Sequence, residues 1–328
     1  MTEKAAGSDV GEATLTAVPD GDAWKLYGEK WFCSHADADV ALLLARPEGA
    51  AAGTKGLGLF AMPRRLEDGS RNSYRIVRLK EKLGTKSMAS GEIIFDGAKA
   101  YAVGDVENGI KQMLRQVNLS RLSHGVRAAG MMRRCLNEAL SVARYRRQFG
   151  EPVVNKPLMQ GQLLDMILPT EQALTAVFYA ASAMRRADAG DEAGKKALRI
   201  ATPLLKMMAC RDNVPVATAS METRGGLGYI EEWVNARLVR DAQIGLLWEG
   251  TTNMNALDVI TRAVGKEHAE EALLNDVTGW LDAAEGCPGQ LRSRLKQTVS
   301  RAIDFARAVA ADKGNERHCR QAAAGLYH

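Results

Sequence analysis

The sequence has few of the features that mark secreted, membrane or metal-cluster proteins. Its five cysteines are widely spaced, odd in number and form no CxxC pair. That pattern argues against a disulfide framework and a cysteine-based metal cluster, and it favours a reducing cytosol. No apolar run approaches the roughly 20 residues that a membrane span needs, and the N-terminus lacks the charged and apolar segments of a signal peptide. We therefore expect a soluble, cytoplasmic protein with no membrane partner.

Several catalytic signatures are also absent. The sequence contains no G-x-x-x-x-G-K-[ST], no H-E-x-x-H and no G-x-S-x-G, and its five histidines are scattered. P-loop nucleotide binding is thus excluded, nucleophilic or metal-dependent hydrolysis has no support, and no metal site is predicted. The net charge of +5 on 328 residues is mild. It suits an anionic ligand such as a phosphorylated cofactor and does not require nucleic acid.

What is present indicates an α+β fold of ordinary globular composition, with 46% hydrophobic and 25% charged residues. Residues 1–106 contain short runs of β-formers between turn signals, which predict an antiparallel β-barrel or sandwich. Residues 107–265 have long helical periods joined by short loops, which predict an all-α four-helix bundle, with Pro169 kinking or interrupting one helix. Residues 266–328 form a basic, helical C-terminal tail.

Four short stretches are candidate binding sites, and each also has an ordinary explanation. "MTEKAAGSDVG" (residues 1–11) is a polar loop that could bind a cofactor, or a disordered terminus. "KWFCS" (30–34) places an aromatic ring and a hydroxyl on one strand, or is simply a core strand. "RYRRQFG" (144–150) could bind a diphosphate, or its arginines could cap a helix. "RGGLGYIEEW" (224–233) offers backbone amides that could approach a phosphate, although it is not a dinucleotide-binding fingerprint.

A fifth stretch, "LWEGTTN" (residues 247–253), places a single carboxylate between an apolar run and a small, polar turn. Glu249 could be a helix-entry acid, with Thr251, Thr252 or Asn253 as the N-cap. Alternatively, it could be a general base, because a carboxylate desolvated by Leu247 and Trp248 accepts a proton more readily.

Taken together and in order, these five motifs resemble the flavin-dependent acyl-CoA dehydrogenase superfamily, most closely its alkylation-response subgroup. The resemblance covers roughly residues 1–264. It implies that a β-barrel middle domain and a C-terminal helical bundle hold FAD between them. It also implies an oxidoreductase acting on a CH–CH group: Glu249 removes the α-proton of an acyl-CoA thioester while the β-hydride leaves to the flavin.

The resemblance assigns further residues. Arg121 and Ser8 would lie near the substrate, and Ser120 occupies the position where some relatives carry the base. Asn253 departs from the glutamine that is common in the wider family, keeping an amide but losing reach. The residues implied to bind the cofactor are Thr2, Ser8, Phe32, Ser34, Thr251 and Asn253, and those implied to reach the FAD of a neighbouring subunit are Arg146, Gln148, Phe149, Gly225, Gly226 and Gly228.

The resemblance also raises questions about the whole protein. It implies a homo-oligomer, typically a homotetramer, with electron-transfer flavoprotein or oxygen as the electron acceptor. Members normally begin with a helical domain, so we expect that domain to be missing here. Either the chain is a fragment, active or inactive, of a longer protein, which we favour, or a separate chain supplies the missing part. The alternative function is a DNA-associated flavoprotein with little dehydrogenase activity. Its DNA contacts would come from the basic tail of residues 266–328, which resembles the start of an additional helical domain in the alkylation-response subgroup. The tail carries Arg292, Arg294, Lys296, Arg301 and Arg307, although arginines at such spacings more often form a solvated helix face.

Overall fold

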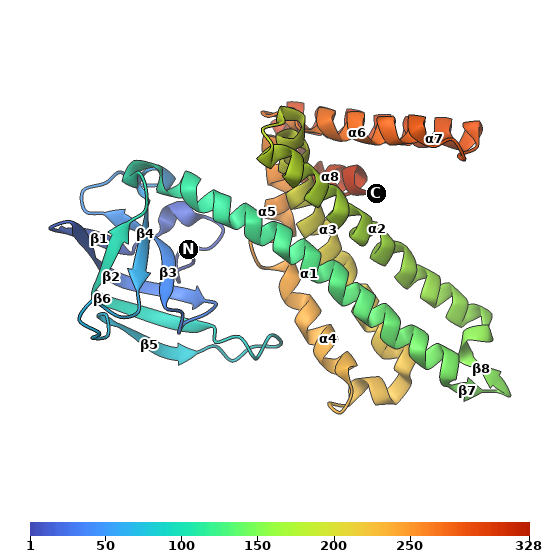
Figure 1. Ribbon diagram of the computed structural model, residues 1–328, viewed down its shortest axis with the longest axis horizontal. Coiled ribbons are helices and arrows are strands. Elements are labelled where there is room, and N and C mark those ends of the chain that lie inside the picture. Colours follow the sequence, from blue (N-terminus) through green and yellow to red (C-terminus); the bar gives the residue numbers. More distant parts are fainter. The chain divides into compact units, whose positions relative to one another are not determined.

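The computed structural model describes residues 1–328, apart from the side chain of residue 313. Contacts divide the chain into two compact units, Met1–Val117 and Asn118–His328, and each is described by itself. Figure 1 labels the elements of both units. The α+β class is confirmed: a closed, barrel-like sheet comes first in the chain and helices follow it.

The first unit is built on a six-stranded sheet in the order β2-β1-β3-β4-β6-β5. An additional pairing of β2 with β6 closes the sheet on itself. All neighbouring strands are antiparallel, as expected, except β1 and β3, which pair in parallel. The strands are β1 (Thr16–Asp20), β2 (Ala23–Cys33), β3 (Val40–Pro47), β4 (Gly58–Pro63), β5 (Tyr74–Leu79) and β6 (Gly91–Ala102).

Apolar and polar residues alternate along these strands, and successive side chains of a strand point to opposite faces. The apolar side chains therefore fill the inside of the barrel. Leu26, Phe60 and Ala98 are fully buried there. Trp24 packs edge-on against Phe60, with ring centroids 5.3 Å apart. A short 3-10 turn at Val10–Glu12 precedes β1, one at Thr54–Gly56 lies between β3 and β4, and one at Val106–Asn108 lies between β6 and the first helix.

The second unit is helical. Helix α1 begins in the first unit and continues into the second, and a small hairpin of β7 and β8 follows it. The bounds are α1 (Gly109–Tyr145), β7 (Arg147–Gln148), β8 (Glu151–Pro152), α2 (Pro157–Asp188), α3 (Glu192–Arg224), η5 (Gly225–Tyr229), α4 (Val234–Gln243), η6 (Ile244–Leu246), α5 (Thr252–Leu257), the π-helix η7 (Asp258–Val264), α6 (Glu270–Ala283), α7 (Gly289–Ala311) and α8 (Cys319–Tyr327). A 3-10 turn at Val153–Asn155 and another at Lys313–His318 complete the unit.

Helix α2 runs through Pro169 without a break, so the expected interruption there does not occur. Proline removes one backbone donor from a helix, but packing of the remaining residues can keep the helix intact. The helix buries Leu163, Met166 and Ala173 in a core shared with α1 and α3. In the turn around the proline, the Thr170 hydroxyl donates to the Met166 carbonyl oxygen at 2.7 Å.

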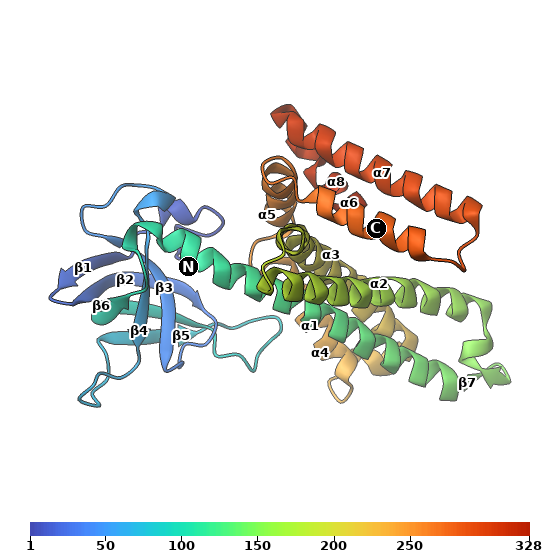
Figure 2. The same cartoon turned by 45° about the horizontal axis from the view of Figure 1, so that its top comes forward.

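The basic tail is helical, as expected, and it shares a core with the helices before it. Figure 2 shows α6 and α7 side by side. A second cluster joins Ile200 of α3 and Ile260 of η7 with Ile303 of α7 and Ala322 of α8. Residues 266–328 thus belong to the same compact unit as the bundle, and a separate domain starting at residue 266 stays a prediction.

Candidate functional site

The Glu249 loop is a tight turn between η6 and α5. Glu249 has φ +51° and Gly250 has φ +90°, so two successive residues adopt the left-handed conformation that is uncommon for residues other than glycine. Thr251 occupies the N-cap position of α5, without a side-chain capping bond. The Glu249 side chain is half-buried, and its Oε1 accepts a hydrogen bond of 2.9 Å from the Ser120 hydroxyl on α1.

Buried donors fix all three carbonyl oxygens of this turn. The Glu249 oxygen accepts from Arg121 Nε at 3.1 Å. The Gly250 oxygen accepts from Lys206 Nζ and from Asn255 Nδ2, the latter at 2.8 Å. Asn255 Nδ2 also donates to the Thr251 oxygen at 2.9 Å. The strained turn therefore has a defined conformation that aims the Glu249 side chain at Ser120.

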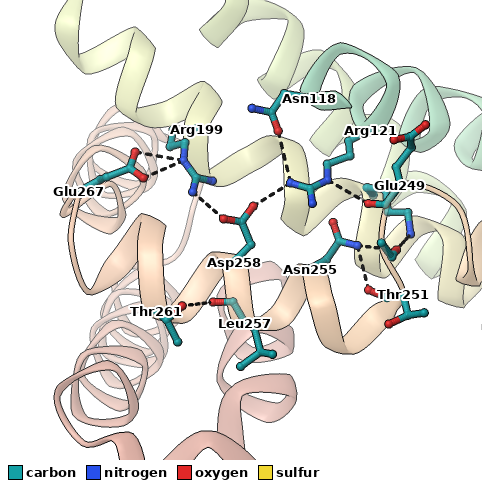
Figure 3. A network of polar contacts seen from close by, with 12 residues as sticks. Asn118, Arg121, Arg199, Glu249, Thr251, Asn255, Leu257, Asp258, Thr261 and Glu267 are labelled. Carbon is teal, nitrogen blue, oxygen red and sulfur yellow. Dashed lines mark hydrogen bonds and ion pairs between the residues drawn. The ribbon is translucent and has the colours of Figure 1, made fainter. Parts of the chain in front are cut away.

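Arg121 connects the turn to a longer chain of charges, shown in Figure 3. Its Nη1 donates to Asp258 Oδ2 at 2.7 Å and to Asn118 Oδ1 at 3.3 Å. Asp258 Oδ1 accepts from Arg199 Nη2 at 2.8 Å, and Arg199 Nε pairs with Glu267 at 3.0 Å. Because Arg121 is only 9% exposed, its guanidinium requires these partners, and its place in the structure is set by α1, η7 and the turn together.

Two further basic groups near the turn have shifted pKa values. Burial, followed by the nearby charge of Arg121, lowers the pKa of Lys206 to about 8, although Cys210 and Glu249 oppose that shift. Burial, followed by the charges of Arg127 and Lys206, lowers the pKa of His124 to about 4. His124 is therefore a neutral imidazole at neutral pH.

The apolar wall expected beside Glu249 is present only in part. Trp248 is half-buried, packs against His124 with the ring planes tilted by 46° and the centroids 4.8 Å apart, and lies 5.3 Å from the Arg127 guanidinium. Leu247, in contrast, is 59% exposed, so it does not enclose the carboxylate within this chain. Of the remaining predicted neighbours, Thr251 is half-buried and Asn253 is exposed.

The structure brings the "RRQFG" and "RGGLG" stretches together at one end of the helical unit. Arg146 Nη1 donates to the Arg224 carbonyl oxygen at 2.8 Å, and a Cβ on Gly225 would lie 3.5 Å from the same nitrogen. Arg146 therefore contacts the glycine turn instead of capping α1. Arg224 is itself held by Asn235 and Glu138, at 2.7 and 2.6 Å.

The three glycines of the "RGGLG" turn differ in backbone conformation and in the space beside their Cα atoms. Gly225 has φ +67° and ψ −150°, a conformation that essentially only glycine adopts. No other heavy atom lies within 4 Å of where a Gly226 Cβ would be, so its backbone is open to a ligand. Gly228 is buried, and a Cβ there would meet the Met221 carbonyl oxygen at 2.4 Å, so close packing alone requires glycine. In the adjoining hairpin, Gln148 is exposed and Phe149 is 92% exposed.

In the first unit, the N-terminal stretch is fixed against strand β2 instead of being disordered. The Thr2 carbonyl oxygen accepts from the Trp31 amide at 2.9 Å. Next to it, Glu3 and Lys30 form an ion pair of 2.6 Å in which both side chains are almost fully buried. Glu3 also accepts from the amide and hydroxyl of Thr14, at 2.6 and 2.9 Å.

The other predicted residues of the first unit are accessible. Phe32 is 56% exposed, which contradicts a simple core role for this ring, and Lys80 Nζ lies 4.6 Å from its centroid. Ser34 follows the end of β2 and is exposed, and Ser8 is exposed in the N-terminal stretch. Thr2, Phe32 and Ser34 therefore lie along one end of β2.

Comparison with known proteins identifies the family. Residues 1–98 match the family model for the middle domain of acyl-CoA dehydrogenases, and residues 107–265 match the model for their C-terminal domain.

The chain belongs to the acyl-CoA dehydrogenase family.

Its relatives include the subgroup that the sequence resembles. It is 39% identical to acyl-CoA dehydrogenase family member 11 of Caenorhabditis elegans over 82% of this chain and 45% of the relative. It is 38% identical to the putative acyl-CoA dehydrogenase AidB of Escherichia coli over 84% of this chain and 50% of the relative. The chain thus spans about half the length of the curated relatives it matches.

A solved structure agrees over nearly the whole chain. C. elegans ACDH-11 in complex with C11-CoA superposes with a TM-score of 0.91 at 34% identity, covering 98% of this chain and 57% of that one. Members of the acyl-CoA dehydrogenase family are FAD flavoproteins. Among the described residues, no helix combines the length and apolar character that crossing a bilayer requires.

Some residues that hold the Glu249 turn could not be found from the sequence. Lys206 and Asn255 hold the Glu249 turn, and Asp258 holds Arg121. The readable signal for Lys206 was a single lysine inside the apolar stretch "ATPLLKMMAC" (residues 201–210). Asn255 had no comparable signal, because polar residues after an N-cap are common.

Proposed function

We propose that this chain carries the FAD-binding and base-bearing part of an acyl-CoA dehydrogenase-like oxidoreductase, with Glu249 as the catalytic base. The observation that supports this most is the Glu249 turn. It is a strained loop whose three carbonyl oxygens are all held by buried donors, and the carboxylate it carries accepts a hydrogen bond from Ser120. Such preorganisation is typical of a catalytic group and is more than a helix-entry acid needs.

The residues present fit FAD at the corner formed by Arg146 and Gly225. Gly226 has open space beside its backbone, and Arg146 is held at the edge of the same turn. A cation next to an open, glycine-rich backbone is a suitable environment for a diphosphate. We assign Arg146, Gln148, Phe149, Gly225 and Gly226 to this contact. Gly228 supports the turn by close packing.

In the first unit, we assign Thr2, Ser8, Phe32 and Ser34 to the flavin ring and the adjoining substrate region. Phe32 and the two serines are exposed, and Thr2 is anchored to β2 through the Trp31 amide. Thr251 and Asn253, at the start of α5, would flank the cofactor from the second unit.

The chemistry follows from the position of the carboxylate. Glu249 takes the proton from the α-carbon of the acyl thioester, and the electrons of that C–H bond form the α,β double bond. FAD, when bound, accepts the hydride that leaves the β-carbon. The Ser120 hydroxyl orients the Glu249 carboxylate, and Arg121 keeps the turn from rotating by holding the Glu249 carbonyl oxygen.

An acyl-CoA thioester is the proposed substrate. ACDH-11, whose structure matches this chain, was solved with C11-CoA. As in the wider family, electron-transfer flavoprotein or oxygen would then take the electrons from the reduced protein. We further propose a homo-oligomer, because Tyr145, Phe149, Leu158 and Tyr229 are 80–92% exposed, and large exposed apolar side chains mark interaction surfaces.

The test is an anaerobic titration of the purified, FAD-loaded chain with a panel of saturated acyl-CoAs, following the flavin absorbance. We expect bleaching in the wild type and a rate about 10²–10⁴ lower in Glu249→Gln, with FAD still bound. Glu285→Gln, which changes an exposed glutamate of the α6–α7 loop, should behave as the wild type. Equal rates in wild type and Glu249→Gln would contradict the base assignment. FAD binding without bleaching by any acyl-CoA would contradict the dehydrogenase function.

The alternative of DNA contact by the tail has less support. Arg307 pairs with Glu270, Lys296 pairs with Asp282, and Arg292 donates to carbonyl oxygens of the preceding loop. Arg301 contacts Gln297. Four of the five basic residues therefore have partners within the chain. Salt-sensitive binding of duplex DNA that is lost in Arg294→Ala and Arg301→Ala together would support the alternative.

A further inference from the structure

A cluster of potential metal ligands lies where η7 ends and α6 begins. One ring nitrogen of His268, one carboxylate oxygen of Glu270 and one of Glu271 all lie within 4.8 Å of one another. The three residues line a cavity of about 400 Å³ together with Gly265 and residues of α7, among them Arg307. This cavity belongs to the second unit and is made of residues that the proposed dehydrogenase chemistry does not use.

Glu270 shows that the cluster is more than a group of surface acids. The residue is 1% exposed, and its Oε1 accepts from Arg307 Nε at 2.9 Å. Its Oε2 is buried and has no hydrogen-bond partner among the described residues. Leaving a buried carboxylate oxygen unpaired costs free energy, because the oxygen loses its water and gains nothing in return. A cation bound in the cavity would remove that cost.

We propose that His268, Glu270 and Glu271 bind a divalent transition-metal ion, with Zn²⁺ as the best match. One imidazole nitrogen and two carboxylate oxygens are ligands that zinc accepts, and three protein ligands leave the fourth position of a tetrahedral site for water. Mg²⁺ and Ca²⁺ prefer oxygen ligands alone, so a site with an imidazole nitrogen suits them less well. At zinc–ligand distances of about 2.0–2.1 Å, tetrahedral ligands are about 3.4 Å apart. The exposed side chains of His268 and Glu271 therefore need to move inward by only about 1 Å.

The surrounding charges agree with a dication. Two carboxylates carry two negative charges, while Arg307 contacts one oxygen of Glu270 and leaves the other for the metal. A ligating carboxylate that also accepts a hydrogen bond from a second residue is the usual arrangement around bound metals. Another cation, Lys196, has its Nζ 3.6 Å from Glu271 Oε2, a long and exposed pair that a metal could replace.

The bound ion would have a structural effect. It would join the turn after η7, through His268, to the first turn of α6, through Glu270 and Glu271, and to α7 through Arg307. The neighbouring Glu267 pairs with Arg199, which also holds Asp258. We therefore expect metal binding to order the junction between η7 and α6, where Glu267 holds Arg199 and so supports the Asp258–Arg121 pair.

The experiment is calorimetric titration of the chelator-treated full chain with ZnCl₂ and, separately, with MgCl₂. We expect one Zn²⁺ per chain, much weaker Mg²⁺ binding, and a zinc affinity lowered at least about tenfold in both His268→Asn and Glu271→Gln. Glu270 is left intact because its carboxylate also pairs with Arg307. Both variants change exposed side chains, and circular dichroism checks that they fold.

Two control variants separate this site from adventitious binding. His35→Asn removes an exposed histidine of the first unit, and Glu285→Gln removes an exposed glutamate of the second. Both should bind zinc as the wild type does. An absence of zinc binding in the wild type overturns the proposal. Zinc binding of equal affinity in wild type and His268→Asn overturns it as well, since the metal would then lie elsewhere.

Discussion

Lys206 gives the sharpest quantitative prediction, because its ammonium group is held inside the helical unit. The residue is 1% exposed, and it donates to the Gly250 carbonyl oxygen that Asn255 also contacts at 2.8 Å. Burial lowers the pKa of Lys206 from 10.5 to about 8. Each pKa unit corresponds to about 1.4 kcal/mol, so keeping this charge in the folded protein costs about 3 kcal/mol at neutral pH.

The sign of the pH dependence follows from where the proton is lost. Below pH 8, Lys206 is protonated in both states, and the folded protein carries the whole cost. Between about pH 8 and pH 10.5, the unfolded chain binds more protons than the folded one, so the free energy of unfolding rises with pH. Above pH 10.5 the lysine is neutral in both states and the cost is gone.

Lys206→Met removes the charge while keeping a side chain of similar length. Asn255 still donates to the Gly250 oxygen, so that carbonyl is not left unpaired. We expect the variant to be more stable than the wild type at pH 7 by up to about 3 kcal/mol. This difference should shrink towards zero by pH 10.5. Lys195→Met, on the exposed face of the same helix, should show no such trend.

The assay is denaturant unfolding followed by far-ultraviolet circular dichroism at several pH values from 7 to 10.5. The difference between wild type and Lys206→Met at each pH isolates this residue, because other titrating groups are common to both proteins. A difference that stays constant within about 1 kcal/mol over this range would refute the reasoning. It would mean that the lysine is not desolvated as the structure indicates.

Three further changes test separate parts of the structure. Ser120→Ala should slow acyl-CoA-dependent flavin reduction about tenfold, because one hydrogen bond to the Glu249 carboxylate is lost. Stopped-flow absorbance measures this rate, and an unchanged rate would show that the bond does not position the base. Lys30→Met should lower the free energy of unfolding by about 3–5 kcal/mol, because it leaves the carboxylate of Glu3 buried without a cation. Denaturant unfolding measures this free energy, and a change below about 1 kcal/mol would contradict the burial of the Glu3–Lys30 pair. Gly226→Ala should leave stability nearly unchanged, since its Cβ meets no other heavy atom within 4 Å, but should reduce the FAD retained per chain; full retention would place the cofactor away from this turn.

Much of the fold could be predicted from local patterns. The strands around "WKLYGEKWFCS" (residues 24–34) and the helices from residue 109 onwards follow from the side-chain periods of 2 and 3.6. The parallel pairing of β1 with β3 could not be foreseen in this way, because it joins segments that share no hairpin. The unbroken course of α2 through Pro169 depends on packing against α1 and α3, which a local rule does not include.

The candidate site was predictable where a motif is compact and unpredictable where it is assembled at long range. Glu249 stood out because an acid is rare between an apolar run and a turn of small residues. Its partner Ser120 lies 129 residues away in the sequence, and Lys206, which holds the turn, lies 44 residues from Gly250, whose carbonyl oxygen it contacts. Nothing local indicates such contacts. The choice between a binding loop and a disordered terminus for residues 1–11 could not be made locally either, because the buried pair of Glu3 with Lys30 that orders this stretch spans 27 residues.

The π-helix η7 separates the two acids that Arg199 holds, Asp258 at its first residue and Glu267 just beyond its end. A π-turn accommodates one residue more per hydrogen-bonded loop than an α-turn. Deleting one residue such as Thr261 would let the segment relax to α-helix, and each residue of an α-helix advances by about 100°. A deletion inside a regular α-helix would rotate the two acids relative to each other by that angle, but here the π-turn takes up the missing residue, so Asp258 and Glu267 would keep their relative orientation and Arg199 could still hold both. The extra residue of η7 therefore widens the helix locally without changing which face carries the two acids, and homologous chains can be sorted by whether they keep that insertion.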